Sequence, residues 1–125
     1  MRWSIIICTH NRSVYLAENL PKVLELEYSP EKFEVIVVDN ASTDNTSSVA
    51  KEAGVRCVRE GILGLTHARN RGIAESRGDL IAFVDDDAWP ETNWLHELDR
   101  VLACIETPPF SSMWWRSSFS PFPAC

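Results

Sequence analysis

The sequence contains no long apolar segment. Its first apolar run, Ile5–Cys8, is followed at once by the polar residues 9–12, whereas a membrane-spanning helix needs about 20 consecutive apolar residues. We therefore expect neither a signal peptide nor a transmembrane helix. The expected location is the cytoplasm, with peripheral membrane association as the alternative.

Basic side chains are in the minority. The 125 residues include 12 lysines and arginines against 18 aspartates and glutamates, so the formal net charge is −6. A chain with this charge repels polyanions, and we expect no nucleic acid partner. A phosphate-bearing ligand would need a local arginine cluster, main-chain N–H groups, or a cation that neutralises an acidic pocket.

Several common site motifs are missing. The four cysteines, at positions 8, 57, 104 and 125, form no C-x-x-C pair, so we expect reduced thiols and neither a zinc ribbon nor a redox pair. The chain has no G-x-G-x-x-G after a strand, no G-x-x-x-x-G-K-[ST] and no G-x-S-x-G. Dinucleotide-binding, P-loop and hydrolase interpretations therefore lose their main support.

The length fits one domain with a modest core. Apolar runs of strand length alternate with segments of helical periodicity, a pattern typical of a parallel sheet with crossover helices. The expected strands are residues 3–9, 33–39, 55–59 and 80–85. The expected helices are residues 14–24, a short segment ending at 53, residues 66–76, and a last helix from 90 to 102.

Capping residues predict the helix ends. Ser13 and Thr66 are the expected N-caps of the first and third helices, and Gly54 is the expected C′ residue of the second. Pro90 is expected to start the last helix. Pro21 is expected to kink or divide the first helix, because proline lacks the N–H of the helical ladder.

The composition changes after Ala103. Residues 104–125 hold four of the seven prolines and five serines, but only two charged residues, Glu106 and Arg116. A segment with this composition and no periodicity is not a convincing element of a fold. We expect a domain over residues 1–103 and a Pro/Ser/Trp-rich tail over 104–125, which is either disordered or replaces a lost continuation of the domain.

Three polar clusters follow the expected strands, at residues 9–12, 39–42 and 85–87. In a parallel sheet the strands end at one edge, where ligands of open α/β sheets bind. Caps and turns use the same residue types, but three clusters in equivalent places favour a binding site.

The strongest of these clusters is Asp85-Asp86-Asp87. Adjacent carboxylates repel one another, so the cluster needs protonation or a cation. In an extended segment Asp85 and Asp87 would point to one side and Asp86 to the other. Hard oxygen donors in this arrangement suit Mg²⁺ or Mn²⁺, so Asp85 and Asp87 are the candidate metal ligands.

The third expected helix begins with basic residues. Arg69 and Arg71 lie in its first turns, where positive charge opposes the helix dipole. We expect them, together with Asn70, to face an anion or a nucleobase. A solvated basic helix face is the alternative.

The segments SIIICTHNR, EVIVVDNASTDNT and GLTHARNRGIAESRGDLIAFVDDDAWP, in this order, resemble the N-terminal nucleotide-binding half of family 2 glycosyltransferases with the GT-A fold. The resemblance covers residues 4–102. We therefore expect a GT-A-like (Rossmann-like) α/β half-domain with a parallel sheet of strand order 3-2-1-4. The implied ligand is a nucleotide diphosphate sugar, with a UDP-sugar favoured over GDP or dTDP donors.

By this resemblance, Thr9 and Asp39 line the pocket for the nucleobase and Arg69 reaches the nucleotide. Asn11 and Arg12 are further candidates for substrate binding, transferred less directly from the family pattern. These roles follow from the matched motifs alone.

Asp85 and Asp87 match the family's D-x-D motif. The resemblance implies that the carboxylate of Asp85 approaches the ribose and that Asp87 binds Mn²⁺ or Mg²⁺ on the diphosphate. A divalent cation would neutralise the charge that builds on the leaving diphosphate.

The family's catalytic base, a carboxylate in inverting members, has no match here. Glu106 is the sole carboxylate after Asp99 and matches no family motif, so the base and the acceptor remain unassigned. We expect a glycosyltransferase present as its donor half, an incomplete chain whose uncovered surfaces favour self-association. The alternatives are a non-catalytic nucleotide-sugar-binding module and, with less support, a receiver-like or phosphatase-like domain.

Overall fold

The computed structural model describes residues 2–104. Its elements are β1 (Trp3–Thr9), α1 (Ser13–Leu24), the 3₁₀ turn η1 (Pro30–Lys32), β2 (Phe33–Asn40), α2 (Thr46–Glu52), β3 (Arg56–Glu60), α3 (Leu65–Glu75), β4 (Leu80–Phe83) and α4 (Trp94–Cys104). The predicted tail lies outside the described residues, apart from Cys104 at the end of α4. None of the helices described is long and apolar enough to cross a bilayer.

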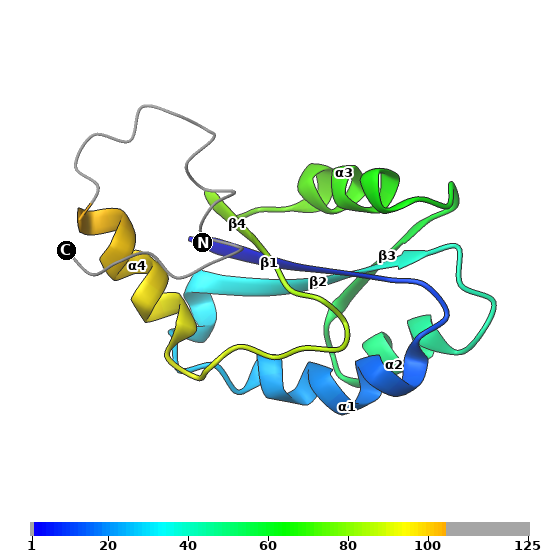
Figure 1. Cartoon of the computed structure of the whole chain (residues 1–125), viewed down its shortest axis with the longest axis horizontal. Helices are drawn as coiled ribbons and strands as arrows, with labels where there is room; N and C mark the ends of the chain where they lie inside the picture. The colour runs from blue at the N-terminus through cyan, green and yellow to red at the C-terminus, as the bar shows by residue number, and fades with distance from the viewer. Residues whose placement is uncertain (1, 105–125) are drawn as a thin grey trace.

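The four strands form one parallel sheet in the order β3-β2-β1-β4 (Figure 1). This order confirms the prediction. β1 is a central strand, and its last residue, Thr9, is in register with Asp39 of β2, which is in register with Arg59 of β3. The register therefore places these three side chains in one row at the carboxyl edge.

The side chains of β1 alternate between two apolar cores. Trp3, Ile5 and Ile7 face the core that α1, α2 and α4 cover, whereas Ile6 faces the core under α3. Figure 1 shows α3 on one side of the sheet and α1 with α2 on the other. All four β1 side chains are at most 2% exposed, and burying each contributes roughly 1.5–3 kcal/mol.

Small residues bring α3 close to the sheet. Ala68 is 1% exposed, and a Cβ added at Gly72 would lie only 2.5 Å from Cγ2 of Ile6. The absence of a side chain at Gly72 thus allows the helix to rest directly on β1.

The N-termini of α1 and α3 differ from the predicted ones. Ser13 is the first helical residue, after Arg12 at the N-cap position, and its N–H donates to Oδ2 of Asp44 at 3.3 Å. A carboxylate from another loop therefore satisfies this helix end, and the prediction of Ser13 as the cap is wrong. Thr66 lies inside α3, whose N-cap is Gly64 with φ of +144°, a conformation that favours glycine.

Of the predictions for Pro21 and Gly54, one is confirmed and one is not. α1 continues through Pro21 to Leu24, so the predicted division is absent from this described helix. Leu20 and Val23 are buried next to Pro21, and their packing maintains the helix despite the missing N–H. Gly54 follows the end of α2 with φ of +79°, which confirms its predicted role.

α4 begins at Trp94 and not at the predicted Pro90. The carbonyl of Thr92 accepts a hydrogen bond from the N–H of Glu27 at 2.7 Å. This bond ties the segment before α4 to the connection between α1 and β2. The first bond of the helix follows it, from the N–H of Glu97 to the carbonyl of Asn93 at 3.0 Å.

Asp99 of α4 joins three distant side chains. It accepts hydrogen bonds from Nε of Arg2 at 2.7 Å, from Nε1 of Trp3 at 2.9 Å and from the hydroxyl of Tyr28 at 2.6 Å. Burial acts to raise the pKa of Asp99, but these hydrogen bonds outweigh it and lower the pKa below its ordinary value. Burial and the bond to Asp99 raise the pKa of Tyr28 to about 12.

Two cysteines meet the expectation of reduced thiols and one does not. Cys8 and Cys57 are half-buried free thiols, and burial raises the pKa of Cys8 to about 11 and also raises that of Cys57. Cys104 is disulfide-bonded, so the expectation is wrong for this residue. Cys125 lies outside the described residues.

Candidate functional site

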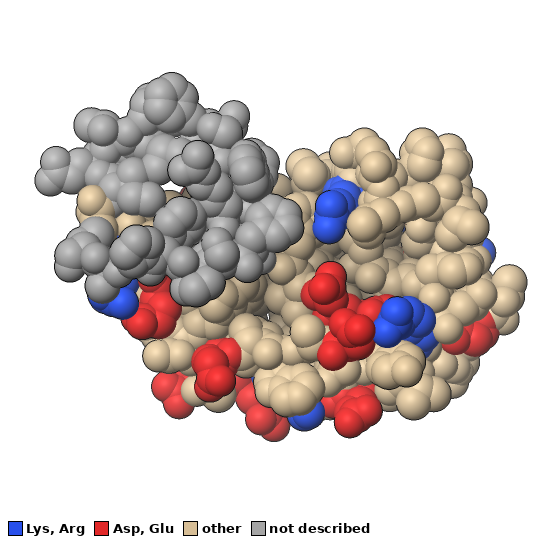
Figure 2. Space-filling view, in the orientation of Figure 1, with Lys and Arg blue, Asp and Glu red and all other residues tan. Residues whose placement is uncertain are grey.

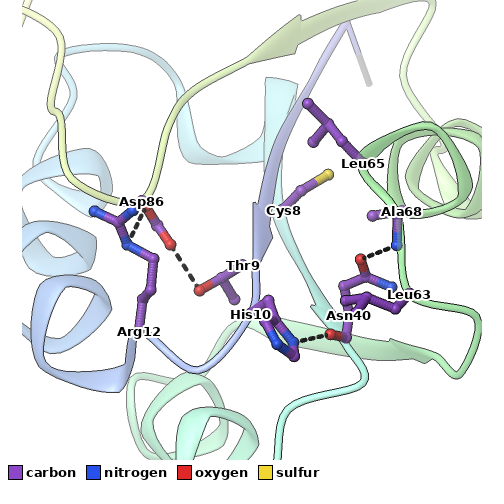
Figure 3. A pocket seen from close by; sticks show the side chains of 10 residues that line it. Cys8, Thr9, His10, Arg12, Asn40, Leu63, Leu65, Ala68 and Asp86 are labelled. Carbon is purple, nitrogen blue, oxygen red and sulfur yellow. Dashed lines mark hydrogen bonds and ion pairs between the residues drawn. The ribbon is translucent and has the colours of Figure 1, made fainter.

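The end of β1 is linked to the segment after β4 through Asp86. Thr9 Oγ1 donates to Asp86 Oδ2 at 2.8 Å, and the amide of Asn19 in α1 donates to the main-chain oxygen of Asp86 at 3.1 Å. Arg12 Nε lies 3.3 Å from Asp86 Oδ1. These contacts, two of them visible in Figure 3, draw two of the three polar clusters together at the carboxyl edge.

Asp85 and Asp87 lie on either side of this buried anchor. β4 ends at Phe83, and the N–H of Ala88 donates to the carbonyl of Asp85 at 3.2 Å, so the acidic cluster lies in a turn and not in the predicted extended segment. Asp86 is nevertheless 7% exposed, whereas Asp85 and Asp87 are exposed. The predicted extended conformation is therefore wrong, and Asp86, which was expected to point away, lines a pocket.

Arg12 bridges two members of the acidic cluster. Its Nη2 donates to Asp87 Oδ2 at 3.2 Å, beside the Nε contact with Asp86. Burial raises the pKa of Asp86, while the Thr9 hydrogen bond and the charge of Arg12 act in the opposite direction. The guanidinium therefore offsets part of the mutual repulsion of the carboxylates.

The donor set of this turn fits a cation that is shared with a ligand. The exposed carboxylates of Asp85 and Asp87 are hard oxygen donors suited to Mg²⁺ or Mn²⁺. Within residues 2–104, no three His, Cys, Asp or Glu side chains are grouped so that they could hold a metal ion by themselves. Water or the phosphates of a ligand would therefore have to complete the coordination.

Asp39 is almost fully buried, at 2% exposure, and both its oxygens have partners. Oδ1 accepts the N–H of Ser42 at 3.1 Å, and Oδ2 accepts Nη1 of Arg59 at 3.2 Å. The carboxylate thus shapes the loop between β2 and α2, and its negative charge is paired.

Asn11 holds the same loop from the side of β1. Its Oδ1 accepts the N–H groups of Thr43 at 2.8 Å and of Asp44 at 3.2 Å, and its own N–H donates to Ser42 Oγ at 2.9 Å. Asn11 has φ of +50°, a conformation that asparagine tolerates better than most residues. The structure therefore gives Asn11 a role in joining two of the three clusters.

A pocket of about 290 Å³ opens beside these clusters. One wall is apolar and comes from α3 and the loop before it, and the other carries polar groups from β1, β2 and the acidic turn. Its described lining consists of Cys8, Thr9, His10, Arg12, Asn40, Leu63, Gly64, Leu65, Ala68 and Asp86 (Figure 3). Of the predicted site residues, Thr9 and Arg12 belong to this lining, and Asn11, Asp39, Arg69, Asp85 and Asp87 do not.

The basic residues of α3 separate into two environments. The guanidinium carbon of Arg69 lies 5.4 Å from the centre of the Phe83 ring, at the end of β4. Arg71 is exposed and its Nε lies 3.5 Å from Glu75 Oε2, which is the solvated helix face of the alternative interpretation. Acidic groups predominate over basic ones on the face in Figure 2, in keeping with the net charge of −6.

Sequence reasoning missed the parts of the site that depend on distant contacts. Asp86 was expected to point away, but it is the anchor of the acidic turn. Asn40 and His10 were noted only as members of clusters, and the apolar wall with Leu63 and Leu65 was not predicted. A polar residue directly after a buried strand was the one available signal for Asn40.

The fold is a GT-A-like parallel α/β sheet with its polar clusters at one edge. Residues 4–103 match the sequence profile of glycosyl transferase family 2, and the chain belongs to this family. Among curated relatives, the glycosyltransferase AglE of Haloferax volcanii is 36% identical over 98 residues, which are 74% of this chain and 32% of AglE.

Solved structures agree with this assignment. Staphylococcus aureus TarS in complex with UDP-GlcNAc superimposes with a TM-score of 0.76 and 25% identity over 82% of this chain and 31% of that one. The mannosyltransferase PcManGT of Pyrobaculum calidifontis, in complex with GDP-Man and Mn²⁺, has a TM-score of 0.74 and 29% identity over 86% and 33%. The chain spans about a third of the length of these relatives.

Proposed function

We propose that the chain binds a nucleotide diphosphate sugar at the carboxyl edge of its sheet and takes part in transfer of the sugar. The observation that carries this proposal is the link from Thr9 to Asp86 and Arg12, which joins two polar clusters beside the pocket in a member of family 2. A UDP-sugar is the first candidate donor, with GDP and dTDP sugars as alternatives. Complexes of relatives with UDP-GlcNAc and with GDP-Man support this ligand class.

The residues around the edge have distinct proposed roles. Thr9 and Asp39 are proposed to line the pocket for the nucleobase, Asp39 through the Ser42 and Arg59 groups that its oxygens hold, and Arg69 is proposed to reach the nucleotide from α3. Arg12 carries a positive charge at the pocket lining, where it is suited to a diphosphate. Asn11 acts through the loop that it holds.

Asp85 and Asp87 are proposed to complete the donor site. Asp85 would face the ribose, and Asp87 would be the main protein ligand of Mn²⁺ or Mg²⁺. When bound, this cation would neutralise negative charge on the leaving diphosphate. The Mn²⁺ in the complex of PcManGT supports a divalent cation here.

The described residues supply no candidate for a base that would activate the acceptor. No carboxylate follows Asp99 within residues 100–104, and the acidic turn is proposed to act on the donor. A nucleotide-sugar-binding module without turnover is the second candidate function. A cytoplasmic location and self-association stay predictions.

Titration calorimetry with UDP and GDP tests the proposal. We expect at least one nucleotide to bind, with a dissociation constant several-fold lower in Mn²⁺ than in EDTA. The absence of binding to either nucleotide, and to dTDP, would contradict the proposal. Release of nucleoside diphosphate from a panel of sugar donors then separates turnover from binding alone.

A further inference from the structure

We propose that Asn40, the last residue of β2, is a positioning residue that fixes both walls of the pocket and thereby sets its affinity for the nucleotide. This inference rests on the proposed function. Asn40 is 5% exposed, and it connects the end of β2 with the loop before α3 and with His10 after β1.

The side-chain amide of Asn40 is fully matched by main-chain groups of one loop. Its Nδ2 donates to the carbonyls of Glu60 at 3.1 Å and Ile62 at 2.8 Å, and its Oδ1 accepts the N–H of Gly64 at 3.0 Å. The Asn40 amide thus uses both of its N–H donors and its oxygen acceptor. Aspartate has no side-chain N–H and leucine has no polar side-chain atom, so neither could form this set of bonds.

The loop that Asn40 holds has, among the described residues, one other side-chain hydrogen bond, from the N–H of Ile62 to Oε2 of Glu60 at 3.0 Å. Ile62 and Leu63 are 60% and 61% exposed, so their side chains gain little from burial that would fix the loop. Yet Leu63 and Gly64 form part of the pocket lining. Asn40 therefore supplies most of the side-chain hydrogen bonds that hold this wall, three against the single bond of Glu60.

Asn40 acts on the opposite wall through its main chain. Its carbonyl lies 2.6 Å from Nδ1 of His10 (Figure 3), and since a carbonyl only accepts, Nδ1 carries the proton. In the neutral ring Nε2 is then an acceptor, 3.4 Å from the donor Nδ2 of Asn11. One residue thus determines the place of the loop wall and the tautomer of a histidine in the lining.

A pocket with preformed walls binds a ligand more tightly than one that must be ordered on binding, because ordering of a loop opposes association. Loss of the Asn40 amide should therefore weaken binding even in a chain that remains folded. We expect a dissociation constant roughly tenfold higher or more.

The test uses the full chain and its Asn40→Ala and Asn40→Asp variants, with UDP and Mn²⁺ as the probe. Asn93→Asp makes the same substitution at an exposed residue before α4 and serves as the control. Calorimetry is run well below each unfolding temperature, and amide hydrogen exchange follows Gly64. Both Asn40 variants should bind at least tenfold more weakly and exchange Gly64 faster, while the control matches the unaltered chain.

Long-range ¹H–¹⁵N spectra separate release of the loop from general loss of structure. The unaltered chain should show the His10 proton on Nδ1, and the Asn40 variants, which keep the main-chain carbonyl that accepts from it, should show the same tautomer while Gly64 exchanges faster. Variants that bind UDP within twofold of the unaltered chain would overturn the inference.

Two further outcomes separate this inference from the proposed function. If the unaltered chain binds no nucleotide, the proposed function fails, and the role of Asn40 in binding fails with it, although slow exchange at Gly64 would still show that the loop is held. If the variants do not fold, amide exchange at Gly64 in the unaltered chain is the deciding measurement. Exchange as fast as in an unstructured peptide would overturn the inference, and strong protection would support it.

Discussion

Thr9 and Asp86 lie 77 positions apart in the sequence and are joined by a hydrogen bond of 2.8 Å between two buried side chains. The bond joins the end of β1 to the acidic turn. β4 ends at Phe83, three residues before Asp86. Because Asp86 is held in this way, its neighbours Asp85 and Asp87 are presented to solvent. The middle residue of the acidic turn thus has a structural role of its own.

The first prediction concerns the metal. Asp87→Ala should remove the gain in UDP affinity that Mn²⁺ gives, because the exposed carboxylate of Asp87 is the proposed ligand, and we expect a loss of roughly tenfold or more. Titration calorimetry with Mn²⁺ and with EDTA measures it. Glu91→Ala, which removes another exposed acidic side chain, is the control, and an unchanged Mn²⁺ effect in Asp87→Ala would contradict the assigned role.

The second prediction concerns Arg12, which lies 3.2 Å from Asp87 and competes with a cation for that carboxylate. Arg12→Gln should raise the affinity for Mn²⁺ alone by about two- to fivefold, the range that exposed ion pairs contribute. The same variant should weaken UDP binding, because a positive charge near the diphosphate is lost. Opposite signs in these two titrations are the expected result, and a parallel loss of both would contradict it.

Arg100→Gln provides the matched control for this experiment. Arg100 forms an ion pair with Glu97 at 3.0 Å on the surface of α4. Removing that pair should leave the Mn²⁺ and UDP titrations unchanged, because neither residue belongs to the pocket or to the acidic turn.

The third prediction concerns stability and pH. The pKa of Asp99 is lowered in the fold, so its contribution is complete above the ordinary carboxyl pKa and is lost as the pH falls below about 4. The partly exposed Asp99 accepts three hydrogen bonds, and Asp99→Ala should lower the free energy of unfolding by about 2 kcal/mol. Urea denaturation at several pH values measures both effects, and an equal acid sensitivity in Asp99→Ala would contradict the assignment.

Tyr28 gives this network a second signature at high pH. Its pKa of about 12 means that the neutral phenol stabilises the fold fully below about pH 10 and that this contribution is lost as the pH rises toward 12. Ultraviolet titration of a Tyr15→Phe chain follows Tyr28 alone, because the sequence has two tyrosines. Adding Asp99→Asn should lower the observed pKa.

The fourth prediction concerns the thiols of Cys8 and Cys57. β2 lies between their strands, so two inter-strand steps of about 4.8 Å separate them, more than a disulfide spans. Burial raises both pKa values, so iodoacetamide should label them slowly in the native chain at pH 8 and readily after unfolding without reductant. Peptide mass spectrometry decides, and a Cys8–Cys57 bridge would contradict the sheet order.

The central strands β1 and β2 could be predicted because their apolar residues are consecutive and buried on both faces. β1 begins and ends where it was predicted. β4 ends earlier than predicted, because Asp86 bonds to Thr9 and Arg12 and the acidic residues form a turn. The start of α1 was misplaced because the carboxylate of Asp44, distant in sequence, accepts its first N–H, and the start of α4 was misplaced because the segment before it is bonded to the distant Glu27. Local propensity carries no information about such partners.

The candidate site was predictable where it consists of polar residues after strands. The three clusters were located correctly at the carboxyl edge, because parallel strands must end there. The contribution of Asn40 and of the exposed Leu63 was not predictable, since it depends on main-chain hydrogen bonds across the loop between β3 and α3.

The central place of β1 also has a kinetic consequence. β1 is synthesised before both of its neighbours in the sheet, β2 and β4, so Trp3 can pair with Phe33 and Leu80 only after those strands have been made. Contacts over such sequence separations slow folding, and a nascent chain with one strand edge unpaired is prone to aggregation. Ribosome-bound chains ending before β4 should therefore be the species that chaperones bind most strongly.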